Sequence, residues 1–269
     1  MRRSAGYRLD AAICVYDLAE RLGIEIRFLD IPSMEGMYYR ASEPAIILSS
    51  LRPPGRRVFT CAHELGHHNQ RNGTHVDHFA EQWKRPGWDS KEFAADCFAG
   101  ALLMPKMAVE RAFTLRQWKI SESTPGQVYR ISTYFGVGYT TLIHHMRTAL
   151  LLLPQSHAEA LLKVNRRQAQ ALALGWETPE TVWVVDAHWT DRAIDVEAGD
   201  LIFVHGQPSS EGNCIERVVE AEGGRLLRAS QPGIGRLEDG SGWSAFVRVS
   251  RRGFVGRSLY RHLEEPDDE

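Results

Sequence analysis

Residues 56–70 read RRVFTCAHELGHHNQ and contain an H-E-x-x-H pentapeptide, His63-Glu64-Leu65-Gly66-His67. On a helix, residues four apart lie on one face, so His63 and His67 can present ring nitrogens to one metal ion. Glu64 lies about 100° further round the helix, too far to join them as a ligand, and is placed to act as general base on a metal-bound water. The stretch therefore predicts a helix that carries a zinc-hydrolase site.

A short H-E-x-x-H match can also arise by chance, so its surroundings decide its weight. Residues 57–73 have the pattern of a helix that Gly73 closes, and the chemistry requires such a helix. Val58 and Phe59 give this helix an apolar start, and Leu65 and Gly66 are compact enough for close packing. These features favour a real metal site.

A catalytic zinc ion needs a third protein ligand and an open position for water. Asp89 or Ser90 can cap a second helix, KEFAADCFAGALLM (91–104), in which Glu92 is the candidate ligand and after which Pro105 stops the helix. The spacing Asp89-x-x-Glu92 is also that of a helix-capping box, so the residues alone leave both interpretations open. Asp96, one turn after Glu92, either orients a histidine ligand through its second ring nitrogen or is a surface acid.

Other histidines near the motif are weaker candidates for the third ligand. His68 points to a different face of the helix from His63 and His67. His75 and His78 lie in a polar segment, 74–88, that we expect to be a loop. From there they either reach the metal or are solvated.

Taken together, FTCAHELGHHNQ and EFAADCFAGALLMP resemble the signature of the ImmA/IrrE family of bacterial zinc metallopeptidases. In that family a glutamate on the following helix, in an E-x-x-A-[ND]-x-F-A motif, completes the metal site. Glu92, Ala95, Asp96, Phe98 and Ala99 match this motif, with aspartate where asparagine is common. The resemblance implies one Zn²⁺ per chain, held by His63, His67 and Glu92, with Glu64 as the catalytic residue and Asp96 as an outer partner.

Bulk composition indicates a globular protein of two or three small domains. The chain has 269 residues, of which 43% are hydrophobic and 25% charged, and its formal net charge is −2. No apolar run is long enough for a membrane span or a signal peptide, and four scattered cysteines indicate reduced thiols. We therefore expect a cytoplasmic protein that does not coat nucleic acid along its whole surface.

The first 105 residues predict a small α+β unit around the motif. Residues 10–23 have helical spacing, 24–32 alternate as a strand, and 36–50 indicate a hairpin whose second arm is Ala45–Ser49. Because this arm directly precedes the active helix, we expect it to pair with an extended substrate segment.

The middle of the chain predicts a helix-turn-helix. One helix ends near Phe135, the chain breaks at 136–138, and a second helix starts near Tyr139 or Thr140. Residues 104–150 hold six Lys or Arg against two Glu, an excess of four positive charges that could support phosphate contacts. The second helix, however, offers only Arg147 for reading bases, and no DNA-binding residue can be named. We expect a structural or substrate-docking bundle instead of a primary DNA reader.

After a connector at 156–175 that we expect to be helical, strand-like runs alternate with glycine-rich turns. The order of parts resembles the radiation-response regulators of the same family. It implies a multidomain α+β fold: a zincin-like metallopeptidase domain (1–105), a helix-turn-helix region (106–160), and a linker helix with a GAF-like antiparallel-sheet domain (161–269). Such a last domain would sense a small molecule, although most of its aromatic residues are explained as packing.

The resemblance implies a site-specific endopeptidase whose substrate is a DNA-binding repressor of the helix-turn-helix type. Cleavage of that repressor would induce DNA-damage-response genes. The alternative is a transcription regulator that binds DNA through its own helix-turn-helix and carries a structural or vestigial metal site. The intact Glu64 favours the enzyme, because a structural site needs no general base.

Overall fold

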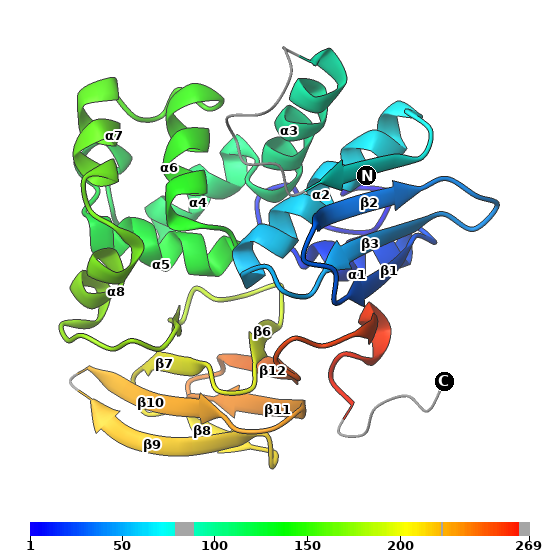
Figure 1. Cartoon of the computed structure of the whole chain (residues 1–269). Helices are drawn as coiled ribbons and strands as arrows, with labels where there is room; N and C mark the ends of the chain where they lie inside the picture. The colour runs from blue at the N-terminus through cyan, green and yellow to red at the C-terminus, as the bar shows by residue number, and fades with distance from the viewer. Residues whose placement is uncertain (79–88, 222, 264–269) are drawn as a thin grey trace.

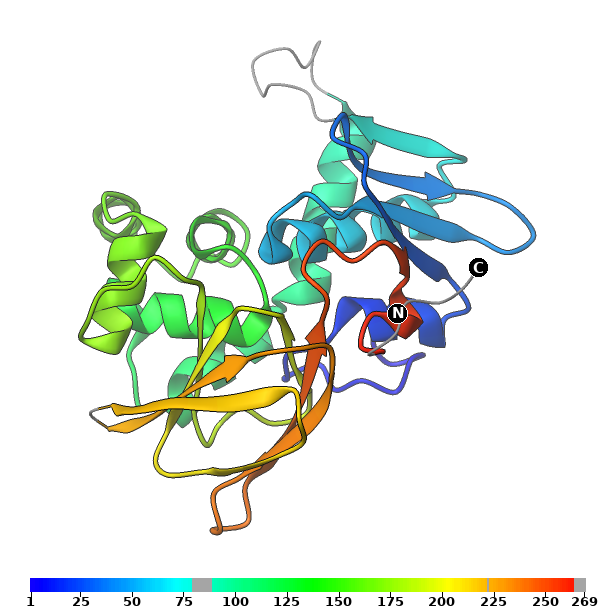
Figure 2. The same ribbon diagram turned by 60° about the horizontal axis from the view of Figure 1, so that its bottom comes forward.

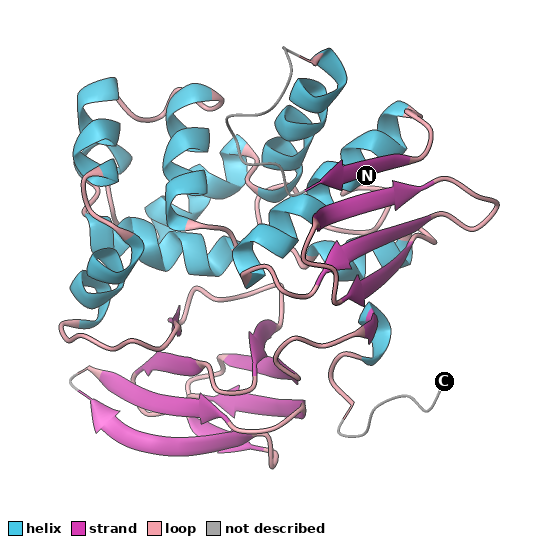
Figure 3. Ribbon diagram, viewed as in Figure 1, coloured by secondary structure: helices cyan, strands magenta, loops and turns pink. Residues whose placement is uncertain are grey.

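The computed structural model describes residues 1–78, 89–221 and 223–263. Figure 1 shows a sheet with two long helices on one side, a group of helices beside them, and two further sheets below. Figure 3 shows the same division, with helices gathered in one half of the view and strands at the right and bottom. The fold is mixed α+β, as predicted.

The N-terminal part is built on a five-stranded sheet in the order β13-β1-β3-β2-β4, in which β13 is Gly256–Arg257. β1 (Glu25–Leu29) runs parallel to β3 (Ala45–Ser49), whereas β2 (Met34–Tyr39) is antiparallel to β3 and to β4 (His75–His78). Alternate residues of β1 are buried, as in a strand with one face on the core. The predicted hairpin is confirmed. The expected pairing of Ala45–Ser49 with a substrate is wrong, because β1 and β2 already occupy both edges of β3.

Helix boundaries near the motif differ from the sequence expectation by a few residues. The first helix, α1 (Val15–Arg21), is shorter than predicted. α2 (Pro54–Gln70) begins three residues before the predicted start at residue 57, at a proline, because the first helical position tolerates a residue without an N–H group. It ends at Arg71, whose φ of 58° is left-handed, and not at Gly73. Part of the expected loop 74–88 is β4, and residues 79–88 lie outside the described residues.

α3 (Ser90–Leu103) packs directly against α2. The carboxylate of Asp89 caps α3 by accepting a hydrogen bond from the Lys91 backbone N–H at 2.8 Å. The two helices approach closely at Gly66, where an added Cβ would lie 3.0 Å from the Cα of Ala95. This close approach brings the side chains of two separate sequence segments together.

Five further helices form the middle of the chain: α4 (Lys106–Leu115), α5 (Pro125–Phe135), α6 (Tyr139–Thr148), α7 (Gln155–Leu162) and α8 (Arg166–Leu174). The predicted break after Phe135 is confirmed, and Gly136 there has a left-handed φ of 69°. The role of α5 and α6 as a DNA-reading unit stays a prediction.

The connector expected at residues 156–175 consists of two helices. α7 packs against α6, and α8 packs against α5. Asn165 and Gln168 form a capping box that starts α8 after a break, a polar signal inside an otherwise amphipathic run. α8 lies so close to α5 that a Cβ on Gly126 would meet the backbone of Leu172 and Ala173 at 2.9 Å. The boundaries proposed at residues 105 and 160 stay a prediction.

The C-terminal part contains two four-stranded sheets, β5-β7-β10-β9 and β6-β12-β11-β8. Their strands are β5 (Val182–Val185), β6 (Ile194–Glu197), β7 (Leu201–His205), β8 (Ser209–Glu211), β9 (Ile215–Ala221), β10 (Gly224–Ala229), β11 (Gly233–Glu238) and β12 (Ser244–Ser250). The expectation of purely antiparallel pairing is wrong: β5 and β7 run parallel, as do β6 and β12. The chain passes from β5 through β6 in the other sheet before β7, which leaves room for a parallel return. The GAF-like assignment stays a prediction.

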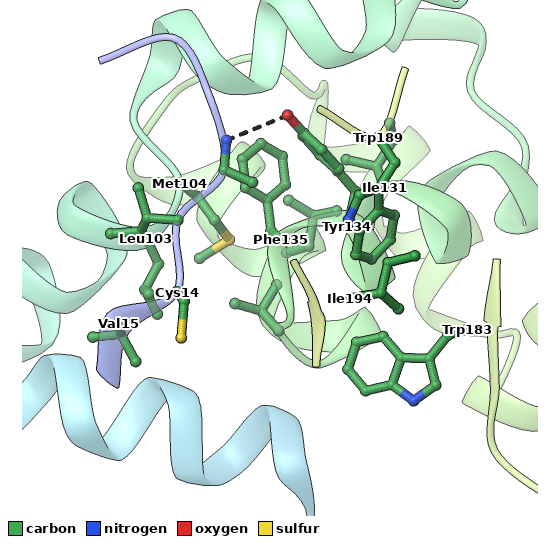
Figure 4. Close-up of a cluster of buried hydrophobic side chains, with 14 of the residues drawn as sticks. Cys14, Val15, Leu103, Met104, Ile131, Tyr134, Phe135, Trp183, Trp189 and Ile194 are labelled. Atoms are coloured by element: carbon green, nitrogen blue, oxygen red, sulfur yellow. Dashed lines mark hydrogen bonds between the residues drawn. The ribbon is translucent and has the colours of Figure 1, made fainter. Parts of the chain in front are cut away.

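The three parts share one hydrophobic core. Figure 4 shows a cluster of this core that contains residues of all three parts, among them Leu103 and Met104 from the end of α3, Phe135 of α5 and Trp183 of the C-terminal part. Beyond β12 the chain returns to the N-terminal sheet, where β13 (Gly256–Arg257) pairs with β1, as Figure 2 shows for the red segment. Among the described helices, none combines the length and apolar character that a membrane span requires.

Candidate metal centre

Three of the predicted ligands meet between α2 and α3. The Nε2 atoms of His63 and His67 lie 3.0 Å apart. Glu92, from the first turn of α3, places one carboxylate oxygen 3.3 Å from His63 Nε2 and the other 3.4 Å from His67 Nε2. Among the described residues, these three form the group whose donor atoms could hold a metal ion.

The donor set fits zinc. Two imidazole nitrogens and one carboxylate are the ligands of a common catalytic zinc site, with ligand distances of about 2.0–2.2 Å. Separations of 3.0–3.4 Å between the donors allow all of them to reach one such ion. The three residues are at most partly exposed, and the two histidines are buried. Glu92 therefore faces the histidines, and Asp89 caps the helix.

Hydrogen bonds at the far side of each ring fix which nitrogen faces the centre. The Nδ1 atom of His63 lies 2.8 Å from Asp96 Oδ1, and the Nδ1 atom of His67 lies 3.1 Å from the side-chain amide of Asn72. Such partners hold the ring orientation and leave Nε2 for a metal. A half-turn of the Asn72 amide exchanges its nitrogen and oxygen, so that Oδ1 accepts a hydrogen bond from the Nδ1–H group of His67.

Asn72 was not among the sequence candidates. It follows the C-terminal end of α2 by two residues, after the left-handed Arg71 turns the chain back toward His67. No motif marks this position, because its proximity to His67 depends on where the helix ends.

The charges around His63 strongly change its proton affinity in the metal-free protein. Burial lowers the pKa of the ring, but hydrogen bonds to Asp96 and Glu92 and the charges of Asp96 and Glu64 outweigh it and raise the pKa to about 10. A metal ion must therefore displace a proton from His63 in order to bind.

Glu64 occupies a separate, enclosed position on α2. Its side chain is fully buried and faces β2, where a Cβ on Gly36 would lie 3.1 Å from Glu64 Oε1 and 2.5 Å from Thr60 Cγ2. Only a glycine lets β2 approach this closely. The strand thus fixes the glutamate beside the histidines without using it as one of the three convergent donors.

The other histidines are placed elsewhere. His68 lies 2.9 Å from the hydroxyl of Tyr38 on β2, one turn beyond Glu64 on the helix face that meets this strand. Burial lowers the pKa of His68. His75 and His78 begin and end β4, which pairs with β2. The sequence interpretation that placed both in a loop is wrong.

A cleft of about 1150 Å³ starts at the metal centre, where His63 and Asp96 line it. It follows the N-terminal end of α2 past the turn between α5 and α6. It reaches the C-terminal part at Trp183, Glu197 and Arg252. All three parts of the chain thus line one space.

The family comparison agrees with this geometry. Residues 19–147 match the family model Peptidase_M78, described as the IrrE N-terminal-like domain. The match supports an ImmA/IrrE-family domain over these residues. The matched residues include α2 and α3, and therefore every residue of the candidate metal centre. The match supports a protease-type hydrolase.

Other comparisons add little. A solved structure of a Mycobacterium tuberculosis transcriptional regulator is similar at 22% sequence identity and a TM-score of 0.38, covering 55% of this chain and 44% of that protein. This chain thus spans less than half the length of that regulator. Among curated proteins, none matches the sequence.

Proposed function

We propose that this ImmA/IrrE-family protein is a zinc-dependent, site-specific endopeptidase that acts in the cytoplasm. Its substrate would be a helix-turn-helix repressor, and cleavage would induce a DNA-damage or radiation response. The observation that carries the proposal is the convergence of His63, His67 and Glu92 beside a buried Glu64 on the same helix. A small-molecule signal at the C-terminal part remains an implication of the family resemblance.

Each residue of the centre has a distinct task in peptide hydrolysis. A Zn²⁺ ion held by His63, His67 and Glu92 would supply a Lewis acid and lower the pKa of water. Glu64 takes the proton from the attacking water and returns it to the leaving amine. Asp96 and Asn72 hold the two imidazole rings in orientation.

The alternative function, direct DNA binding through α5 and α6, requires the start of α6 to reach base edges in a groove. In the structure this end of α6 faces α2: a Cβ on Gly55 would lie 3.0 Å from the backbone nitrogen of Gly138. Val137 and Tyr139 on either side of Gly138 are buried. The contact with α2 at the start of α6 therefore disfavours docking of a DNA duplex there.

The positive charges that could have contacted phosphates are mostly engaged within the protein. Lys106, Arg111, Arg116 and Lys119 form ion pairs with Glu110, Asp10, Asp186 and Glu122 respectively. Arg130 donates to the carbonyl of Ala173 and contacts the ring of His205. The local excess of four positive charges is therefore a poor indication of a DNA-binding surface, and the observations favour the enzyme.

The direct test is incubation of the zinc-loaded protein with purified helix-turn-helix repressors, analysed by intact-mass spectrometry. A discrete pair of products is expected with the wild-type protein and none with Glu64→Gln. Random degradation, or equal cleavage by both proteins, would refute the proposed mechanism.

A comparison in cells separates the two functions. A strain with Glu64→Gln should lose the damage response, whereas Arg147→Ala on α6 should retain it. The opposite pattern would favour a DNA-binding regulator. If both strains lose the response, specific DNA binding by purified Glu64→Gln protein decides between them, because only a DNA reader would keep it.

A further inference from the structure

The cleft that begins at the metal centre is larger than ligand pockets usually are, which span about 300–1,000 Å³. Its walls come from segments far apart in sequence: α2, the α5–α6 turn, the start of α8 at Arg166, and the C-terminal part at Arg252. A long molecule can therefore lie between the three parts and still reach the metal centre.

The charge that this cleft presents to a ligand is positive. Side chains of Arg56 and Arg252 are 50% and 61% exposed, and Arg166 is also exposed. Two of the acids that line the cleft are covered: Glu35, paired with Arg56, is 5% exposed, and Glu197 is 10% exposed. The third, Asp96, is 50% exposed and lies at the metal centre, where it pairs with His63. Away from the metal centre, the outer surface of the cleft is therefore formed by arginines.

Backbone groups add to the positive character. The N-terminal ends of α2 and α6 meet at Gly55 and Gly138, and neither end has a side-chain cap. Helix N-terminal ends carry partial positive charge and free N–H groups, which favour carboxylates. The arginines and the two helix ends thus act with the same sign on the same space.

The lining suits a peptide better than a nucleic acid. Thr141 and Thr181, whose hydroxyl groups can bond a peptide main chain, line the cleft. Single-stranded nucleic acids need several exposed aromatic rings for stacking, but of the aromatic lining residues Tyr129, Tyr139 and Trp183 are buried and only Phe59 is partly exposed.

We propose that this cleft binds an extended, acidic segment of the protein substrate, and that Arg166 and Arg252 select for its carboxylates. The inference rests on the proposed peptidase function and assigns substrate selection to parts of the chain outside the metal centre. The α5–α6 turn then serves as a wall of the cleft.

Zinc-loaded Glu64→Gln protein tests this by fluorescence anisotropy, because binding is then measured without hydrolysis. The probes are labelled octapeptides of alternating Glu and Ala or of alternating Lys and Ala, and octathymidylate. Non-specific attraction to a chain of net charge −2 would favour the basic peptide. We expect the acidic peptide to bind at least about tenfold tighter than the basic one.

Adjacent arginines provide a matched control. Arg166 and Arg167 are both exposed in the first turn of α8, but only Arg166 lines the cleft. Arg166→Glu should weaken binding of the acidic peptide by about threefold to tenfold, and Arg167→Glu by much less. Arg252→Gln, on the opposite wall of the cleft, should also weaken binding of the acidic peptide. Agreement between the two variants shows that the loss does not come from a folding defect in one of them.

Three results would overturn the inference: equal affinity for the two peptides, equal effects of Arg166→Glu and Arg167→Glu, or tighter binding of octathymidylate than of the acidic peptide. Repressor cleavage reports on the proposed function separately. A protein that cleaves but shows no acidic preference would retain the peptidase proposal and lose this one.

Discussion

Replacement of Gly66 by alanine should damage the metal centre without touching any of its ligands. Gly66 lies on α2 between His63 and His67, at the point where α2 meets α3. An alanine Cβ would lie 3.0 Å from Ala95 Cα and 3.3 Å from its carbonyl oxygen. These are backbone atoms, so the contact can be relieved only by moving α3 as a whole.

The size of the movement follows from ordinary contact distances. Carbon atoms prefer separations of about 3.5–4.0 Å, so α3 must shift by roughly 0.5–1 Å. Metal–ligand distances tolerate only about 0.2 Å. Glu92 and Asp96 both belong to α3 and would move with it. We therefore expect zinc affinity to fall by about tenfold to hundredfold, as for the loss of a supporting contact.

Stability should respond much less than metal binding. Overpacking costs about 1–3 kcal/mol, and the higher helix propensity of alanine returns up to about 1 kcal/mol. Gly100→Ala on α3 is the matched control, because its Cβ would meet the ring of His145 at 2.6 Å, a side chain that can turn away. Competition with a fluorescent zinc chelator measures affinity, and urea unfolding of the metal-free proteins measures stability.

The decisive result is a difference between these two variants in metal affinity. If Gly66→Ala binds zinc as tightly as the wild-type protein while its stability falls, the distance between α2 and α3 does not set the ligand geometry. If both variants lose affinity equally, the effect is general loosening of α3. Either result would refute the argument from close packing.

Other perturbations test the remaining roles. Glu64→Gln should keep zinc affinity and lose about 10²–10⁴-fold in cleavage rate, whereas His63→Ala should lose zinc as well, as equilibrium dialysis and product analysis will show. Asp96→Asn should weaken zinc binding by about 10–100-fold at unchanged unfolding midpoint of the metal-free protein. Burial, together with Arg261 and Arg248, lowers the pKa of His262 to about 3. The unfolded chain therefore takes up this proton near pH 6.5 and the folded chain only near pH 3, so stability should fall by about 2–3 kcal/mol between pH 6.5 and 4.5. Urea unfolding of His262→Leu should lack this part of the pH dependence; an equal slope in both proteins would exclude His262 as its source.

The metal centre was predictable where the signal is local. His63 and His67 follow from helical periodicity within five residues, which any stable helix enforces. The predicted strands and the helices on either side of Gly136 also follow from local patterns of burial and turn formation. Glu92 could be chosen over its capping role only through the family resemblance, because a glutamate at the third position of a helix has the same spacing in both roles.

Features that depend on long-range packing could not be predicted. Asn72 reaches His67 because α2 ends at Arg71, and Gly36 approaches Glu64 because β2 lies on α2. The return of residues 256–257 to β1 joins the last strand to the N-terminal sheet, yet two residues are too few for a periodic pattern. In each case the deciding contact is between segments that the sequence does not show as neighbours.

The pair α5–α6 shows why a motif needs its surroundings. A glycine-containing turn between two amphipathic helices is expected of a DNA-reading unit and of an ordinary helical corner alike. Here the turn is explained by its contact with α2, since the backbone of Val137 and Gly138 lies about as close to Gly55 as two chains can pack. The first turn of α6, which would enter a DNA groove, instead lines the cleft that leads to the metal centre. The contact with α2 that disfavours DNA binding by α6 also places the start of this helix in the cleft wall, so the enzyme proposal accounts for the helix pair as well as for the metal centre.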